Sequence, residues 1–180
     1  MDSKPIGRCS VIASNIESIM LVGVILLTGC HSTPTSRAAV PTAVSTAKVF
    51  NLPDEDGQRR SFAGKGPALL SFTTTWCGAC QEHRQDFHDL YRSYKDKGLG
   101  FYAIRVWETA AKVREEIAAE KAPYKHLFDS QAKVSDSYQV EATPTIIVID
   151  AAGRVIYRAT VFDRAELRAE LDSAIAGGRS

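Results

Sequence analysis

The segment that decides the fold reads Trp76-Cys77-Gly78-Ala79-Cys80. The residues before it, 68–73, form a compact apolar run that predicts a buried strand, and apolar residues at helical spacing follow it. The two cysteines therefore lie where a strand ends and a helix begins. A helix N-terminus offers unpaired N–H groups and a partial positive charge, which lower the pKa of a thiol. Cys77 is the predicted nucleophile, and Cys80, one turn further in and more shielded, is predicted to resolve the disulfide.

Strand-like and helix-like patterns alternate along the rest of the chain. Upstream, strand-like pieces at 48–52 and 58–62 flank an Asp-Gly turn, which predicts a β-hairpin. Downstream, the first helix is expected to continue to about Lys97, where Gly98 ends it. The later expected elements are a strand at 100–106, helices at 108–121 and 130–138, strands at 145–150 and 154–158, and a last helix capped by Asp163. This order predicts an α/β fold with a mixed central β-sheet flanked by helices and an N-terminal β-hairpin.

Length and composition narrow the classes of function. The chain has 180 residues and a formal net charge of +1, which suggests one domain with extensions and no large charged surface. No block of lysine and arginine stands out, so a nucleic-acid surface is not indicated. Four cysteines are too few for a disulfide-stapled scaffold. Two of them, Cys9 and Cys30, lie in the N-terminal segment and need their own explanation.

The first 30 residues have the pattern of a targeting signal. Lys4 and Arg8 make a weakly basic start, an apolar run covers 19–27, and Leu27-Thr28-Gly29-Cys30 follows. The last four residues resemble a bacterial lipobox, which implies cleavage before Cys30 and a diacylglyceryl group on its thiol. An uncleaved transmembrane helix is the alternative, but the apolar run is shorter than the ~20 residues that a span needs. Residues 31–46 are rich in Ser, Thr, Ala and Pro and predict a flexible tether.

The motifs of the globular part resemble thioredoxin-like proteins, and closely the TlpA/ResA type. The resemblance covers nearly all of residues 48–175. It is carried by Phe50-Asn51-Leu52-Pro53-Asp54, Gly64-Lys65-Gly66-Pro67, Trp76-Cys77-x-x-Cys80, Tyr138-Gln139-Val140, Thr143-Pro144-Thr145 and Ile149-Asp150-x-x-Gly153. It implies a thioredoxin fold and a thiol–disulfide oxidoreductase whose redox centre is the cysteine pair, with no metal or organic cofactor. The expected organisation is a lipoprotein signal peptide at 1–29, a lipidated cysteine and tether at 30–47, a thioredoxin-like domain at 48–176 and a tail at 177–180.

The same resemblance implies how substrates are bound and where the protein works. It implies a cis Thr143–Pro144 bond beside the cysteines, backbone pairing of Thr143 with the substrate chain, and Trp76 as a wall of the active-site surface. Protein thiols and disulfides outside the cytoplasm are the expected substrates, with apocytochromes among them. For a reductant, a membrane thiol–disulfide transporter is the expected partner that resets the cysteines. The expected location is extracytoplasmic, on a lipid anchor in a bacterial membrane.

Two positions depart from the family pattern. Thioredoxin has a buried acid six residues before the first cysteine, and Ser71 stands there in this chain. ResA-type members often carry a glutamate three residues after the second cysteine, where this chain has His83, preceded by Glu82. Because residues i and i+3 share a helix face, both are candidates for moving a proton from Cys80. A surface histidine without this role is the alternative for His83.

Other interpretations of the same residues stay open. A Cys-x-x-Cys pair also binds metals, but zinc sites usually need four ligands, and no second such pair exists in the chain. His83 and His88 lie nearby, so a copper-binding or holding protein on the same scaffold is the alternative function. Trp107 and Glu108 follow a strand and either edge a substrate groove or form a packing tryptophan with a solvated neighbour. The Gly-Ala pair between the cysteines does not indicate the direction of electron flow.

Overall fold

The computed structural model of this protein describes residues 46–178. The predicted signal peptide, the lipidated Cys30 and nearly all of the tether lie outside these residues and stay predictions. Within the described part of the chain, no helix has the length and apolar character needed to cross a membrane.

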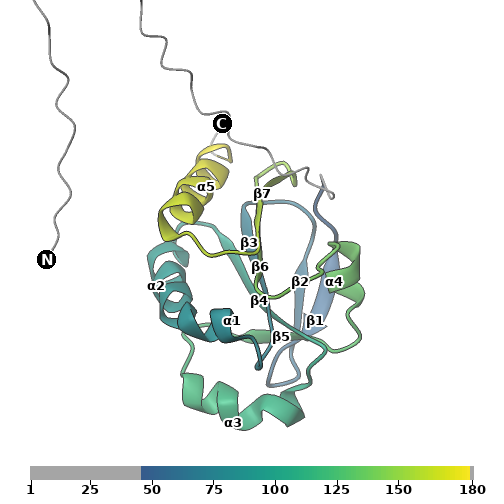
Figure 1. Ribbon diagram of the computed structural model, residues 1–180. Coiled ribbons are helices and arrows are strands. Elements are labelled where there is room, and N and C mark those ends of the chain that lie inside the picture. Colours follow the sequence, from purple (N-terminus) through teal and green to yellow (C-terminus); the bar gives the residue numbers. More distant parts are fainter. Residues whose placement is uncertain (1–45, 179–180) are drawn as a thin grey trace, which may run out of the picture. The chain divides into compact units, whose positions relative to one another are not determined.

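Seven strands and five helices make up the described part of the chain (Figure 1). They are, in order, β1 (Phe50–Pro53), β2 (Arg59–Phe62), β3 (Ala68–Thr73), α1 (Gly78–Glu82), α2 (Arg84–Tyr94), β4 (Gly100–Val106), α3 (Ala110–Glu120), β5 (His126–Asp129), α4 (Lys133–Ser137), β6 (Thr145–Ile149), β7 (Val155–Ala159) and α5 (Arg164–Ala176).

The central sheet has five strands in the order β5-β4-β3-β6-β7. Strand β3 pairs in parallel with β4, which pairs in parallel with β5, while β6 is antiparallel to both β3 and β7. Strands β1 and β2 form a separate antiparallel sheet. The predicted mixed sheet and N-terminal hairpin are thus confirmed.

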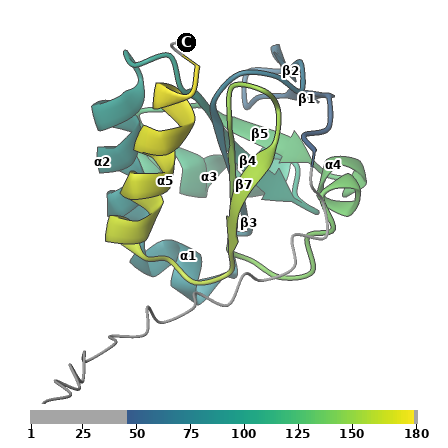
Figure 2. The ribbon, with the colours of Figure 1, turned by 90° about the horizontal axis from the view of Figure 1, so that it is seen from above.

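Apolar side chains fill both faces of the central sheet, because its inner strands are continuous apolar runs rather than alternating ones. One face packs against α2 and α5, with Leu90 and Leu171 fully buried there. The other face packs against the hairpin and α4, with Phe72 and Tyr138 fully buried. Figure 2 shows these two layers on opposite sides of the sheet.

Strand direction brings several loops to one edge of the sheet. Strands β3, β4, β5 and β7 run in the same direction, so their carboxyl ends meet at the edge where the opposed strand β6 begins. The segments at this edge are therefore 74–80, 107–109, 130–132, 142–144 and 160–163.

Two expectations about elements are wrong. A single helix over 77–97 was expected, but the helix is broken at His83, whose backbone has φ −97° and ψ 8°, so that α1 and α2 are separate. The edge strand β5 was not predicted, because its four residues include His126 and Asp129 and lack an apolar pattern. Both ends of β5 become buried only through its neighbours in the fold.

Tyr138 ties the N-terminal strand segment to the domain. Its hydroxyl donates to the Lys48 carbonyl at 3.0 Å and accepts from the Lys48 N–H at 2.9 Å. Burial raises the pKa of the Tyr138 phenol to about 12, so the group stays protonated and remains a donor. This reciprocal pair fixes the chain immediately before β1.

We expect Tyr138→Phe to lower the free energy of unfolding by about 1 kcal/mol, because it removes both hydrogen bonds to Lys48 and keeps the packed ring. Chemical denaturation measures the change. Tyr102→Phe is the matched control, since its hydroxyl makes only an exposed 3.4 Å bond to the Ser61 carbonyl. Equal effects of the two substitutions would contradict the role given to Tyr138.

Candidate active site

Cys77 and Cys80 are joined by a disulfide bond, with an S–S distance of 2.00 Å and a Cα–Cα distance of 5.2 Å. Cys77 is the N-cap residue of α1, and its sulfur accepts a hydrogen bond from the Cys80 N–H at 3.1 Å. The predicted place of the pair, between β3 and a helix N-terminus, is confirmed. The prediction that Cys80 is the more shielded of the two is wrong. Cys77 is only 7% exposed, whereas Cys80 is half-buried and borders a cavity.

The peptide bond between Thr143 and Pro144 is cis, as the family resemblance implied. The Thr143 hydroxyl lies 3.3 Å from the hydroxyl of buried Thr74, which belongs to the segment that leads from β3 to Cys77. The Thr145 hydroxyl donates to the Ala142 carbonyl at 2.6 Å and fixes the other side of the same loop. These bonds hold the proline loop next to the cysteine segment.

Two tryptophans are exposed at this edge of the sheet. Trp76, directly before Cys77, is 65% exposed, and Trp107, directly after β4, is 48% exposed. Trp107 has φ +60°, a left-handed backbone conformation that is rare for a bulky residue, and its N–H bonds to the Asp129 carbonyl. The expectation of a packing Trp107 is therefore wrong, and the alternative, an edge of a substrate groove, fits its position.

Glu108, which was expected to be a solvated neighbour of Trp107, is buried. The residue is 2% exposed, and its Oε1 accepts hydrogen bonds from the Thr75 N–H at 3.0 Å and the Thr75 hydroxyl at 2.5 Å. Its Oε2 is buried without a hydrogen-bond partner among the described residues. A carboxylate from the end of β4 thus holds the turn that presents Trp76 and Cys77. The local sequence carried no signal for this, because the contact joins residues 33 positions apart.

Glu82 and His83, the two candidates for proton transfer, lie at the C-terminal end of α1. Glu82 is exposed. His83 stacks on Phe162, with ring centroids 4.6 Å apart, and its Nδ1 lies 3.3 Å from Asp86. A role for His83 or Glu82 in moving a proton from Cys80 stays a prediction.

His88, which was considered as a copper ligand, is buried and faces α3. Its Nε2 lies 3.3 Å from Oε1 of Glu120. Among residues 46–178, no group of three or more His, Cys, Asp or Glu side chains is placed to hold a metal ion. The arrangement therefore gives no geometric support to a metal site built from the cysteines and these histidines.

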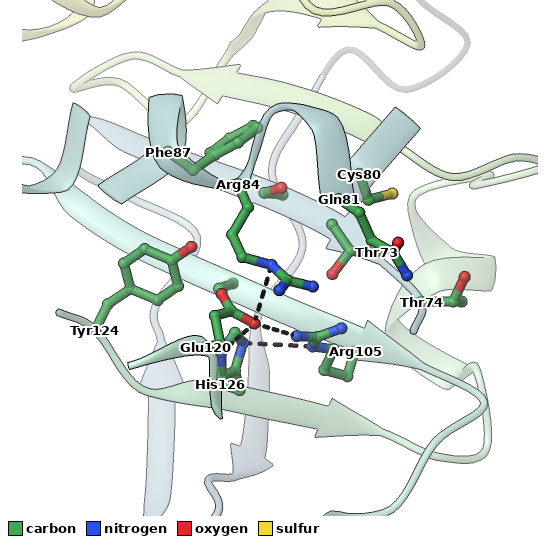
Figure 3. A pocket seen from close by; sticks show the side chains of 12 residues that line it. Thr73, Thr74, Cys80, Gln81, Arg84, Phe87, Arg105, Glu120, Tyr124 and His126 are labelled. Carbon is green, nitrogen blue, oxygen red and sulfur yellow. Dashed lines mark hydrogen bonds and ion pairs between the residues drawn. The ribbon is translucent and has the colours of Figure 1, made fainter. Parts of the chain in front are cut away.

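A small cavity lies behind Cys80, on the side of the sheet that carries α2 and α3 (Figure 3). Its volume is about 30 Å³, enough for one or two water molecules. Ser71, at the position of the family's buried acid, lines this cavity together with Cys80. Charged side chains form the opposite wall.

Glu120 is the centre of these charged groups. Its Oε2 lies 2.7 Å from Nη2 of Arg105, 3.7 Å from Nε of Arg84 and 3.4 Å from Nε2 of His126. Burial alone would raise the pKa of Glu120, but His126, Arg105 and His88 lower it to about 2. Glu120 is thus a carboxylate at neutral pH. Apart from His88, none of these groups was singled out from the sequence, because they come from four elements, α2, β4, α3 and β5, that meet only in the fold.

Sequence comparisons place the chain in a family. Residues 37–175 match the Redoxin family, so the chain belongs to it. It is 32% identical over 124 residues to the thiol-disulfide oxidoreductase ResA of Geobacillus kaustophilus, covering 67% of this chain and 70% of the relative. It is 29% identical over 110 residues to ResA of Bacillus cereus, covering 59% of this chain and 63% of the relative. The match thus spans just under two thirds of the Bacillus cereus protein.

Solved structures share the fold of this chain. A thiol:disulfide interchange protein of the thioredoxin family from Chlorobium tepidum has a TM-score of 0.64 at 23% identity, covering 73% of this chain and 97% of that one. A secreted disulfide oxidoreductase of Mycobacterium tuberculosis, described as homologous to DsbE, has a TM-score of 0.60 at 18% identity, covering 69% and 95%. The predicted thioredoxin fold is confirmed.

We expect Glu108→Ala to slow thiol–disulfide exchange and to lower the free energy of unfolding by about 1–3 kcal/mol, because the Thr75 N–H loses its partner. Glu108→Gln keeps an acceptor oxygen and should lose less. The rate at which the reduced protein reduces a small aromatic disulfide gives the measurement, with exposed Glu115→Ala on α3 as the control. An unchanged exchange rate in Glu108→Ala would rule out this positioning role.

Proposed function

We propose that this protein is an extracytoplasmic thiol–disulfide oxidoreductase that exchanges the Cys77–Cys80 pair with protein substrates, as a reductant. The observation that carries the proposal is a disulfide at the N-terminus of α1 beside the cis Thr143–Pro144 loop. Family membership and the named activity of the ResA relatives support it.

The proposed reaction uses the two cysteines in sequence. In the reduced protein, the Cys77 thiolate attacks a substrate disulfide, a mixed disulfide forms, and one substrate sulfur leaves and takes a proton. The Cys80 sulfur then attacks the Cys77 sulfur, which closes the Cys77–Cys80 bond and releases the second substrate thiol. Two electrons have passed from the cysteine pair to the substrate, and the pair itself is the only redox centre that the reaction needs.

The surface around the cysteines suits an extended polypeptide. Trp76 and Trp107 expose large apolar side chains at this edge of the sheet. Val161, in the loop that follows β7, is 76% exposed. The backbone of Thr143 is proposed to pair with the substrate chain, while the tryptophans contact its side chains. The hydroxyl bond between Thr143 and Thr74 supports this by fixing the loop in place.

The proposed location and partners follow from the sequence signal and the relatives. Cleavage before Cys30 and its lipidation would tether the domain to the outer side of a bacterial membrane. A reductant in that place needs electrons from a membrane thiol–disulfide transporter, and apocytochromes are a proposed class of substrate. No observation on the described residues favours the copper-holding alternative.

We expect Cys80→Ser to trap substrates as mixed disulfides on Cys77, because the resolving sulfur is missing, and Cys77→Ser to trap none. Non-reducing electrophoresis followed by mass spectrometry identifies the trapped proteins. The control is the Cys77→Ser protein expressed at the same level. Equal trapping by both variants would argue against Cys77 as the attacking residue.

The direction of electron flow is tested by the reduction potential of the domain from residue 48 onward, equilibrated against glutathione. We expect a value near or below about −230 mV, in the range of glutaredoxins and thioredoxin, which fits a reductant that is fed with electrons. A value above about −180 mV would mean an oxidant or isomerase and would remove the transporter from the proposal.

A further inference from the structure

The cavity behind Cys80 has a wall that contains two arginines. Arg84 from α2 and Arg105 from β4 contribute two positive charges, and Glu120 from α3 contributes one negative charge. Glu116 contacts both arginines, at 3.3 Å from Nη2 of Arg84 and 3.6 Å from Nη1 of Arg105, but does not line the cavity. Two arginines therefore line the cavity next to Cys80, and two glutamates lie against them.

Tyr124 and His126 are the other titratable side chains that line this cavity besides Cys80. Burial raises the pKa of the Tyr124 phenol well above its ordinary value, so it stays uncharged. His126 from β5 has no hydrogen-bond partner on its Nε2 among the described residues, although Glu120 lies 3.4 Å away. The charged or titratable groups that face the cavity or its central carboxylate are Arg84, His88, Arg105, Glu120, Tyr124 and His126.

Figure 3 shows Arg84 and Arg105 reaching Glu120 from two different elements, and Cys80 and Thr73 line the same cavity. Both guanidinium groups keep their charge at every physiological pH. Arg105 is 4% exposed, so solvent screens its field only weakly. Arg84 is fixed in the same wall by Glu116 and Glu120.

We propose that Arg84 and Arg105 hold Cys80 as a thiolate in the reduced protein, and that Glu116 and Glu120 limit this effect. The inference rests on the proposed function and assigns control of its resolving cysteine. Ser71, which lines the same cavity as Cys80, offers no carboxylate that could act as a base. In the proposed step, a thiolate stabilised by the arginines attacks the Cys77 sulfur without a base. The bond between Cys77 and the substrate breaks, and the substrate leaves as a thiolate that takes a proton from water.

The test uses two substitutions that change the charge in opposite directions at partly exposed positions. In full-length protein carrying Cys77→Ser, we expect Arg84→Gln to slow alkylation of Cys80 by iodoacetamide about threefold at a pH below the thiol pKa. Glu116→Gln should accelerate it about threefold. Mass spectrometry of the peptide that contains Cys80 gives the rates without interference from Cys9 and Cys30.

Three further variants separate charge from structure. Arg84→Lys keeps the charge and should restore a rate close to that of the parent protein. Arg92→Gln on α2 and Glu115→Gln on α3 remove the same charges at exposed positions away from the cavity and should leave the rate unchanged. A structural disturbance would shift both test variants in one direction.

Opposite shifts with recovery in Arg84→Lys support electrostatic control of Cys80. Unchanged rates, shifts in the same direction, or no recovery in Arg84→Lys overturn it. If Cys80→Ser still traps substrates while the alkylation rates do not respond, the proposed function stands and this inference alone falls. If Cys80→Ser traps no substrate and the alkylation rates do not change, both the proposed function and this inference are overturned.

Discussion

The position of β3 between a parallel and an antiparallel neighbour is the constraint on which the site depends. Ser71 pairs with Ala103 of β4 on one side and with Ile146 of β6 on the other. Because β6 runs against β3, the start of β6 meets the end of β3 at one edge of the sheet. The cysteine segment and the Thr143–Pro144 loop, more than 60 residues apart, are thereby neighbours.

The end of β4 lies at the same edge of the sheet, and the two residues that follow it are one exposed and one buried. Trp107 turns outward on a left-handed backbone, and Glu108 turns inward to hold Thr75. One pair of adjacent residues thus supplies exposed apolar area and support for the turn before Cys77. After the break between α1 and α2 at His83, Arg84 begins a new helix and contacts Glu116 of α3.

A group of buried and partly buried charges lies next to Cys80. Removing one partner from a buried charge network leaves an uncompensated charge and is strongly destabilising. Glu120 contacts two arginines and two histidines, so it belongs to a group of charges rather than to a single ion pair. Within this group, Arg105 is buried, and solvent screens its charge less than that of the partly exposed Arg84.

Apart from strand β5 and the helix break at His83, the sequence by itself determined the order of elements, and it also determined the thioredoxin fold and the cysteine pair. Apolar runs such as 68–73 and 145–149 identify buried strands without knowledge of their partners, and a Cys-x-x-Cys pair at a strand end carries its chemistry within five residues. Only the tertiary structure decided that Glu108 is buried, that Trp107 is exposed, and that Arg84, Arg105 and Glu120 meet behind Cys80. These facts depend on contacts between distant segments, and no local pattern encodes which polar side chain the folded core will enclose.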